Sequence, residues 1–411
     1  MDYSAPRIYL SSPHMGGEEL DYVHDAFEKN WIAPLGENVN GFEEDLQSYT
    51  GRNHAAVVTS GTAAIHLALI LCGVTPGDEV ICQSFTFAAS ANPIRYQGAT
   101  PVFIDSEPET WNMDPELLEQ AILDRLSKDG QGKKQGGKPK AIVLVHLYGM
   151  PAKTEQIVKI GEKYDIPVIE DAAEALGSSV NGQKCGSFGH FSVLSFNGNK
   201  IITTSGGGAL LSDDKAQIEK ARFLATQARD EAPHYQHSQL GYNYRMSNIV
   251  AGIGRGQMSV LDDRVAARRA NHDFYFDALN GSWLNSKNHD LFFNLQNSSK
   301  SGIYFLREPA RVKSNRWLTT ILVNPEETGG KTRDDLRRAL EQQNIESRPL
   351  WKPMHRQPLY RGAPYYGRGV SDKLFEYGLC LPSGSNLSDE DRSRIVSVIN
   401  SVLQSSAVTE Q

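Results

Sequence analysis

The feature that most constrains the fold is a regular alternation of short, apolar, β-rich runs with segments of helical periodicity, which begins near Ala55. Short apolar runs bounded by turn residues are typical of strands buried on both faces. Strands that alternate with helices indicate a mostly parallel sheet covered by helices on both sides, and therefore an α/β fold. The seven predicted strands are 55–59, 79–83, 101–105, 141–146, 167–170, 191–196 and 209–212, and the helices between them include 62–72, 115–126 and 154–164.

The remainder of the chain predicts a second, smaller unit. A helical pattern runs from Ser247 to about Leu279 and would link a large domain to a C-terminal α+β domain. In that domain we predict strands at 316–323 and 345–350 and helices at 331–343 and 388–403, whereas residues 280–315 give no clear pattern. We expect a large domain over residues 1–260, with residues 1–50 packing on it, and a small domain over residues 261–411.

Charge and cysteine usage exclude several classes of protein. The chain carries 42 basic and 49 acidic residues, a formal charge of −7, and no long basic stretch, so nucleic acid is not an expected partner. The longest apolar run, 63–74, contains His66 and is too short to span a bilayer, and residues 1–12 lack the apolar core of a signal peptide. The four cysteines form no Cys-x-x-Cys pair, which predicts reduced thiols in a cytoplasmic protein and no metal site.

Lys200 lies in Ser-Phe-Asn-Gly-Asn-Lys-Ile-Ile-Thr-Thr-Ser-Gly-Gly-Gly (195–208), between a predicted strand and a glycine triplet that leads into the next strand. A lysine buried near such a turn is disfavoured as an ammonium ion and becomes available as a neutral nucleophile. An amine of that kind forms a Schiff base with a carbonyl cofactor or substrate. A single loop lysine is more often simply solvated, so the interpretation depends on the other residues around the predicted sheet.

Asp171 follows the predicted strand at 167–170, at the carboxyl end where open α/β sheets bind ligands. A carboxylate there can pair with the protonated pyridine nitrogen of pyridoxal phosphate. Asp171 and Glu174, three residues later, also match a capping box, so a helix N-cap is an alternative explanation of both residues.

Thr59–Ala64 (Thr-Ser-Gly-Thr-Ala-Ala) joins a predicted strand to a predicted helix. Free backbone N–H groups at a helix N-terminus, with a hydroxyl beside them, suit a phosphate dianion, and Gly61 and Thr62 are the candidates. Ser195 could add a hydroxyl from the next strand. An ordinary hydroxyl-capped helix explains the same residues. Phe87, which closes another strand, could stack on a flat cofactor ring, although such aromatics more often pack in a core.

With these motifs in place, the chain closely resembles the DegT/DnrJ/EryC1/StrS sugar aminotransferases, which are fold-type I pyridoxal-phosphate enzymes. The resemblance covers nearly the whole chain. It is carried by residues 10–19, 31–36, 146–149, 169–177, 195–208, 241–248, 348–355 and 380–384. Within the family it is greatest to the UDP-N-acetylbacillosamine aminotransferases. The implied fold is a large domain with a mostly parallel seven-stranded sheet and a smaller C-terminal α+β domain.

The resemblance also implies roles for individual residues. Lys200 would bind pyridoxal 5′-phosphate as a Schiff base and then move the catalytic proton, and Asp171 would keep the pyridine nitrogen protonated. Phe87 would stack on the ring, while Gly61, Thr62 and Ser195 would bind the phosphate. Glu174 would lie near the ring hydroxyl, and Asn243 would reach the phosphate of a neighbouring subunit in a homodimer. Three further residues, His14, Arg245 and His355, are candidates for the sugar-nucleotide pocket; their structural alternatives are a loop histidine, a surface salt bridge and a core histidine.

The implied reaction is a two-stage transamination. L-glutamate would convert the cofactor to pyridoxamine phosphate and leave as 2-oxoglutarate, and the amine would then pass to a UDP-linked 4-keto-6-deoxy sugar used in bacterial glycan synthesis. A TDP- or GDP-linked sugar, or a 3-keto sugar, would share every cofactor residue. A sugar dehydratase function is less consistent with this sequence, because the related dehydratases have histidine at the position of Lys200. A non-catalytic sugar-nucleotide-binding relative would be expected to have lost Lys200 or Asp171.

Overall fold

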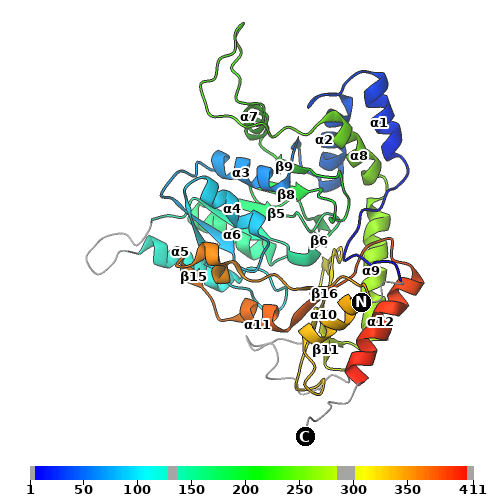
Figure 1. Cartoon of the computed structure of the whole chain (residues 1–411). Coiled ribbons are helices and arrows are strands. Elements are labelled where there is room, and N and C mark those ends of the chain that lie inside the picture. Colours follow the sequence, from blue (N-terminus) through cyan, green and yellow to red (C-terminus); the bar gives the residue numbers. More distant parts are fainter. Residues whose placement is uncertain (1–4, 128–136, 285–300, 405–411) are drawn as a thin grey trace.

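The computed structural model describes residues 5–127, 137–284 and 301–404, and its centre is an eight-stranded sheet (Figure 1). The order across the sheet is β1 (His54–Val58), β9 (Gly208–Ser212), β8 (Phe191–Ser195), β5 (Val168–Asp171), β4 (Ala141–Val145), β2 (Glu79–Gln83), β3 (Thr100–Ile104) and β15 (Tyr365–Tyr366). Only β9 runs against its neighbours. All seven predicted strands are present, which confirms the α/β fold class, and the eighth, β15, comes from the C-terminal part of the chain.

Both faces of this sheet are covered, as the apolar strands predict. Ala56, Val58 and Cys82 point to one face and pack with α3 (Gly61–Leu71), α4 (Ala88–Tyr96) and α7 (Lys215–Ala225). Ile81 and Leu144 point to the other face and pack with α5 (Pro115–Leu126) and α6 (Thr154–Tyr164). Successive strand residues point to opposite faces, so a strand covered on both sides is apolar throughout.

The helical pattern at 247–279 forms two helices, so the prediction of one long helix is wrong. α8 (Asn248–Met258) ends before Ser259, and α9 (Leu261–Ala278) continues toward the C-terminal sheet. α1 (Glu19–Glu28) and α2 (Glu37–Thr50) pack closely on α8, where a Cβ atom at Gly252, Gly254 or Gly256 would overlap their atoms. This packing fixes the direction of α8, and the chain turns after Met258 because α9 packs on different elements, β13 and α12.

The C-terminal part forms a five-stranded sheet in the order β10 (Ser282–Trp283), β11 (Ile303–Phe305), β13 (Thr319–Val323), β16 (Gly378–Leu381) and β14 (Arg348–Pro349). The predicted helices at 331–343 and 388–403 are α10 (Arg333–Gln342) and α12 (Asp389–Gln404). A small third sheet joins β12 (Val312–Lys313), β6 (Ser179–Val180) and β7 (Gln183–Lys184). Residues 285–300, in the stretch that gave no pattern, lie outside the described residues.

The C-terminal part of the chain pairs with the N-terminal segment and with the large sheet. Ile8 forms a parallel bridge with Ile345, beside the C-terminal sheet, while β15 pairs with β3 of the large sheet. The division into domains at residue 260 stays a prediction. No described helix combines the length and the apolar character needed to span a bilayer.

Asp105 fixes the C-terminal segment to the end of β3. Its buried carboxylate accepts hydrogen bonds of 2.8 to 3.0 Å from the backbone N–H groups of residues 368–371, at the start of α11 (Val370–Tyr377). Burial alone would raise the pKa of Asp105, but hydrogen bonds from Ser371, Ser106 and Arg368 outweigh it and hold the pKa below its ordinary value. The carboxylate is therefore the form that the fold stabilises.

We expect Asp105→Asn to lower the free energy of unfolding by about 3 kcal/mol at pH 7, because it turns an amide NH2 toward buried N–H groups. The pKa of Asp105 is depressed in the folded state, so this contribution is complete above the ordinary aspartate pKa of about 3.9 and is lost as the pH falls through the folded-state value. Urea denaturation of both proteins should show a difference that shrinks below pH 4. Asp165→Asn, at an exposed ion pair with Lys138, is the control and should leave the urea midpoint unchanged.

Candidate active site

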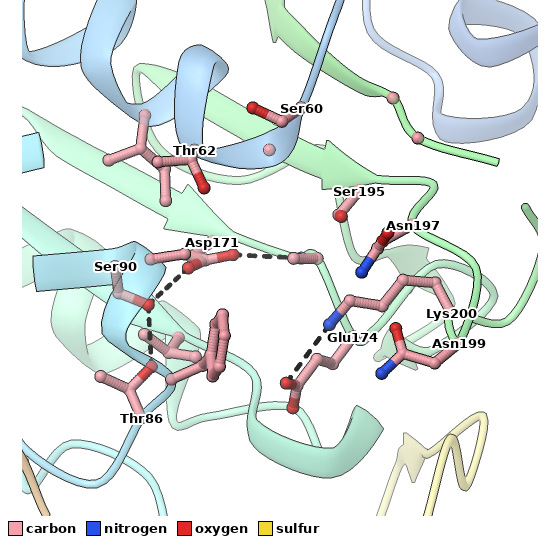
Figure 2. Close-up of a pocket in the computed structure, with 18 of the residues that line it drawn as sticks. Ser60, Thr62, Thr86, Ser90, Asp171, Glu174, Ser195, Asn197, Asn199 and Lys200 are labelled. Atoms are coloured by element: carbon pink, nitrogen blue, oxygen red, sulfur yellow. Dashed lines mark hydrogen bonds and ion pairs between the residues drawn. The ribbon is translucent and has the colours of Figure 1, made fainter. Parts of the chain in front are cut away.

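Loops at the carboxyl ends of β1, β2, β5 and β8 border a cavity of about 310 Å³ (Figure 2). Parallel strands bring their carboxyl ends to one edge, which is why segments far apart in sequence meet there. Seven of the predicted site residues line the cavity: Gly61, Thr62, Phe87, Asp171, Glu174, Ser195 and Lys200.

The N-terminus of α3 forms one wall. The Ser60 hydroxyl caps the helix by accepting a hydrogen bond from the Ala63 N–H group, and the first N–H groups of the helix have no acceptor within it. Gly208 packs so closely against Ser60 and Gly61 that a Cβ atom at 208 would overlap their backbone, and a Cβ at Gly61 would come 3.1 Å from Cβ of Ser195. Both glycines therefore preserve an open cradle beside a helix N-terminus, a setting that suits a phosphate dianion.

Asp171 lies at the floor of the cavity, at the last position of β5. Its Oδ2 accepts a hydrogen bond of 2.7 Å from Ser90, whose hydroxyl also contacts that of Thr86 at 2.8 Å, and its Oδ1 accepts from the Ala173 N–H group at 3.2 Å (Figure 2). Burial raises the pKa of Asp171 despite these bonds and the positive charge of Lys200. A cation placed beside this carboxylate would be strongly favoured, because it would offset the cost of burying the charge.

The alternative that Asp171 and Glu174 form a capping box is wrong. No helix follows β5: the chain forms turns over residues 173–177 before β6. Glu174 instead accepts a hydrogen bond at Oε2 from the Tyr148 N–H group, at 2.7 Å, and its Oε1 lies 3.5 Å from the Lys200 amine. Tyr148 has a left-handed backbone (φ 55°), a conformation that is rare for a bulky residue and that aims this N–H group at the carboxylate.

Lys200 points into the cavity from a turn between β8 and β9 (Figure 2). Its Nζ atom lies beside Glu174 and 4.2 Å from the centre of the Trp317 ring. A carboxylate and an aromatic face both suit an ammonium group. Burial raises the pKa of Glu174, against the opposing effects of Lys200 and Tyr148. The Glu174 carboxylate and the Lys200 amine lie close enough to exchange a proton.

Aromatic side chains form the remaining wall. Phe87, at the start of α4, is 51% exposed, and its ring centre lies 5.2 Å from that of Trp351. Trp317 and Trp351 also line the cavity, and sequence reasoning did not select either one. Trp351 lies within residues 348–355, one of the motifs that carry the family resemblance, so this motif could have pointed to it. No sequence motif pointed to Trp317, which adjoins the stretch without a clear pattern.

The remaining candidates lie outside the cavity lining. His14 contacts the Ser385 hydroxyl at 3.0 Å, and the guanidinium of Arg245 forms an ion pair of 3.1 Å with Glu43. His355 is a core histidine, half-buried, stacked on Tyr365 and hydrogen-bonded to Ser84 at 2.7 Å. Asn243 is exposed. The contacts of His355 match its structural alternative, whereas the Arg245–Glu43 ion pair is largely buried and is not the surface salt bridge that was the alternative for Arg245. Roles of His14, Arg245 and His355 in the sugar-nucleotide pocket stay predictions.

One buried group in the described part of the chain has the composition of a metal site: His146, Glu170 and Cys185. The His146 Nε2–H group donates to Glu170 at 2.9 Å, and Nδ1 accepts from the Ala152 N–H group at 3.0 Å. Glu170 also accepts hydrogen bonds from Gly186, Phe188 and Ser192. Both imidazole nitrogens of His146 therefore have hydrogen-bond partners, and the group is explained as a buried hydrogen-bond network that includes Glu170 of β5.

Comparison with known proteins agrees with this geometry. The model of the DegT/DnrJ/EryC1/StrS aminotransferase family matches residues 13–400. The chain is 50% identical to the putative pyridoxal phosphate-dependent aminotransferase EpsN of Bacillus subtilis (strain 168), over 96% of this chain and 95% of that protein. It is 35% identical to GDP-perosamine synthase of Caulobacter vibrioides (strain ATCC 19089 / CIP 103742 / CB 15), over 97% and 99%.

Among solved structures, the pyridoxal phosphate form of the putative sugar aminotransferase Spr1654 from Streptococcus pneumoniae superposes with a TM-score of 0.80 at 26% identity. The match covers 97% of this chain and 99% of that one. A pyridoxamine phosphate form of the same protein matches equally well. The predicted fold type and cofactor class are confirmed at the level of the family. The particular resemblance to UDP-N-acetylbacillosamine aminotransferases is not among these matches and stays a prediction.

Proposed function

The chain belongs to the DegT/DnrJ/EryC1/StrS aminotransferase family, and on that premise we propose that it transfers the amino group of L-glutamate to C4 of a nucleotide-linked 4-keto-6-deoxy sugar. The observation that carries the proposal is one cavity lined by Lys200, Asp171, Phe87 and the N-terminus of α3. Glutamate and the keto sugar would yield 2-oxoglutarate and the amino sugar, so atoms and electrons balance without another reactant.

The residues of the cavity fit pyridoxal 5′-phosphate. Gly61, Thr62 and Ser195 would hold the phosphate, and Phe87 would stack on the ring. Asp171 would pair with the pyridine nitrogen, and a protonated nitrogen would keep this buried carboxylate ionised. When bound, the cofactor supplies a carbonyl that accepts the amino group and a ring that takes up an electron pair.

The remaining steps fall to the chain's own side chains. Lys200 would bind the cofactor covalently and later hold the proton that moves to and from the substrate carbon. Glu174 would accept the lysine proton whenever the neutral amine is required, because its carboxylate lies 3.5 Å away. The wall formed by Phe87, Trp317 and Trp351 would exclude water from the reacting groups.

We also propose that the active unit is a homodimer. Besides Lys200, no described residue that lines the cavity is a lysine, arginine or histidine, although the proposed sugar nucleotide and glutamate are both anionic. The exposed Asn243 follows residues 231–240, almost all of them exposed, which Figure 1 shows extended away from the body of the molecule beyond α7. In the proposal this segment meets a second copy, where Asn243 reaches the cofactor phosphate.

The proposed sugar is UDP-2-acetamido-2,6-dideoxy-4-keto-hexose, which would give UDP-4-amino-4,6-dideoxy-N-acetylglucosamine for bacterial glycan synthesis. Support for it is the set of motifs shared with bacillosamine-type aminotransferases. Synthesis in the cytoplasm accords with four free thiols. A GDP-linked 4-keto sugar is the second candidate, favoured by 35% identity to a GDP-perosamine synthase over nearly the whole chain.

Incubation of the purified protein with glutamate and a panel of UDP-, GDP- and TDP-linked 4-keto sugars tests the proposal. We expect 2-oxoglutarate release in step with amino-sugar formation, fastest for the UDP sugar. Turnover of the GDP sugar alone would support the second candidate. Borohydride treatment should first attach pyridoxal phosphate to the peptide that contains Lys200. Covalent cofactor without turnover of any sugar would contradict the sugar specificity, and protein without covalent cofactor would contradict the aminotransferase function itself.

A further inference from the structure

Lys200 lies on a turn whose backbone is not fixed by strand pairing. β8 ends at Ser195 and β9 begins at Gly208, and within this turn the Lys200 N–H group bonds only the carbonyl of Asn197, at 3.0 Å. A side chain that carries covalent chemistry must nevertheless be placed to within a fraction of an ångström. The contacts that place it therefore have to come from outside the sheet.

Those contacts come from three segments that are distant in sequence. The carbonyl of Asn199 accepts hydrogen bonds from the Ser11 hydroxyl and from the indole N–H of Trp317, both at 2.7 Å. The guanidinium of Arg268, on α9, donates to the carbonyl of Lys200 at 3.4 Å, to the Ser11 hydroxyl at 2.9 Å and to the carbonyl of Trp317 at 2.6 Å. Arg268 thus contacts Lys200 and both residues that hold the neighbouring carbonyl.

Arg268 is an unusual residue for a purely structural role. It is 1% exposed, yet among the described residues no carboxylate pairs with it, and its Nε–H group has no acceptor. Burial, followed by repulsion from Arg264, lowers the pKa of Arg268 to about 9, so the group is still charged at neutral pH. A buried, unpaired cation is costly, and an apolar side chain of similar length would fill the same volume without that cost.

We propose that Arg268 is a positioning residue for Lys200: it fixes the turn of Asn199 and Lys200, and through that turn the direction of the reactive amine. This inference rests on the proposed function.

The test compares Arg268→Met with Arg264→Met in the pyridoxal phosphate-loaded enzyme. Arg264 lies one turn earlier on α9 and donates to the carbonyls of His14 and Met15, and no described hydrogen bond joins it to Asn199 or Lys200. For Arg268→Met we expect kcat to fall by about 30-fold or more, with each KM changed less than about threefold.

Arg264→Met should lower the melting temperature and leave kcat within about twofold. Arg268→Lys keeps a hydrogen-bond donor for the Lys200 carbonyl and should restore part of kcat. Equal effects of Arg268→Met and Arg264→Met on kcat would overturn the proposal. If Arg268→Met does not fold, Ser11→Ala and Arg268→Lys take its place, and an unchanged kcat in both would overturn it. Wild-type protein without cofactor on Lys200 would instead refute the proposed function.

Discussion

Replacement of Lys200 by alanine should lower amino-sugar formation by more than about 10,000-fold, the scale on which a covalent catalyst acts. The Lys200 amine points into the cavity beside Glu174 and over Trp317, and no other amine borders that cavity in the described part of the chain. Pyridoxal phosphate should still bind, since the α3 N-terminus, Asp171 and Phe87 remain, but borohydride should no longer attach it to the protein. Initial rates and mass spectrometry of the reduced protein measure both effects.

Lys184→Ala is a matched control. The Lys184 amine also lies over an aromatic ring, 4.5 Å from the centre of Tyr49, but it lies outside the lining of the cavity. Its loss should leave turnover within about twofold, as expected for a substitution away from the site. Near-normal turnover by Lys200→Ala, or covalent cofactor on another lysine, would refute the role of Lys200.

Asp171→Asn should reduce turnover by about 100- to 1,000-fold, the range seen when one buried electrostatic partner of a reacting group is removed. Asparagine keeps the shape: its oxygen can accept from the Ala173 N–H group and its NH2 group can donate to the Ser90 hydroxyl, which can in turn donate to Thr86, so the fold should be retained. A neutral amide cannot hold a proton on the pyridine nitrogen, so both the rate and the affinity for pyridoxal phosphate should fall. Turnover and fluorescence titration of the cofactor-free protein measure the two quantities.

The control is Asp262→Asn, which changes a carboxylate bonded to Tyr49 away from the cavity. It should leave turnover and cofactor affinity unaffected. If Asp171→Asn retained full turnover, the pairing of Asp171 with the pyridine nitrogen would be refuted. A matching loss of thermal stability in both variants would show that the effect of Asp171 is on the fold.

The sheet and the main site residues were predictable because they depend on local pattern. Uninterrupted apolar runs exist where both faces of a strand are covered. Gly61, Asp171 and Lys200 lie close to the carboxyl ends of such strands, which end at Val58, Asp171 and Ser195. α4 and α7 were not predicted. α4 contains Pro93, which is unfavourable inside a helix, so tertiary packing stabilises it. α7 does carry apolar residues at helical spacing, at Ile218, Ala221 and Leu224, so its signal was present in the sequence.

Relationships between distant residues were not predictable. Asp171 and Glu174 match a helix cap in sequence, and only the left-handed backbone of Tyr148 and the nearby Lys200 show why Glu174 is turned into the cavity. Trp317 reaches the site because its indole N–H group donates to the carbonyl of Asn199, in the Lys200 turn, a contact that no local motif reports. The break after Met258 likewise depends on which neighbours α8 and α9 meet.

The two-residue strand β15 has a consequence for how the protein is made. It covers β3, which would otherwise leave the backbone N–H and C=O groups of a parallel sheet open to pairing with another chain. Asp105 anchors the segment that contains β15. This segment lies more than 100 residues after β9, which precedes it in the chain as a strand of the large sheet. A fragment that stops near residue 260 is therefore expected to aggregate during expression, and the large sheet becomes protected only once the ribosome has released almost the entire chain.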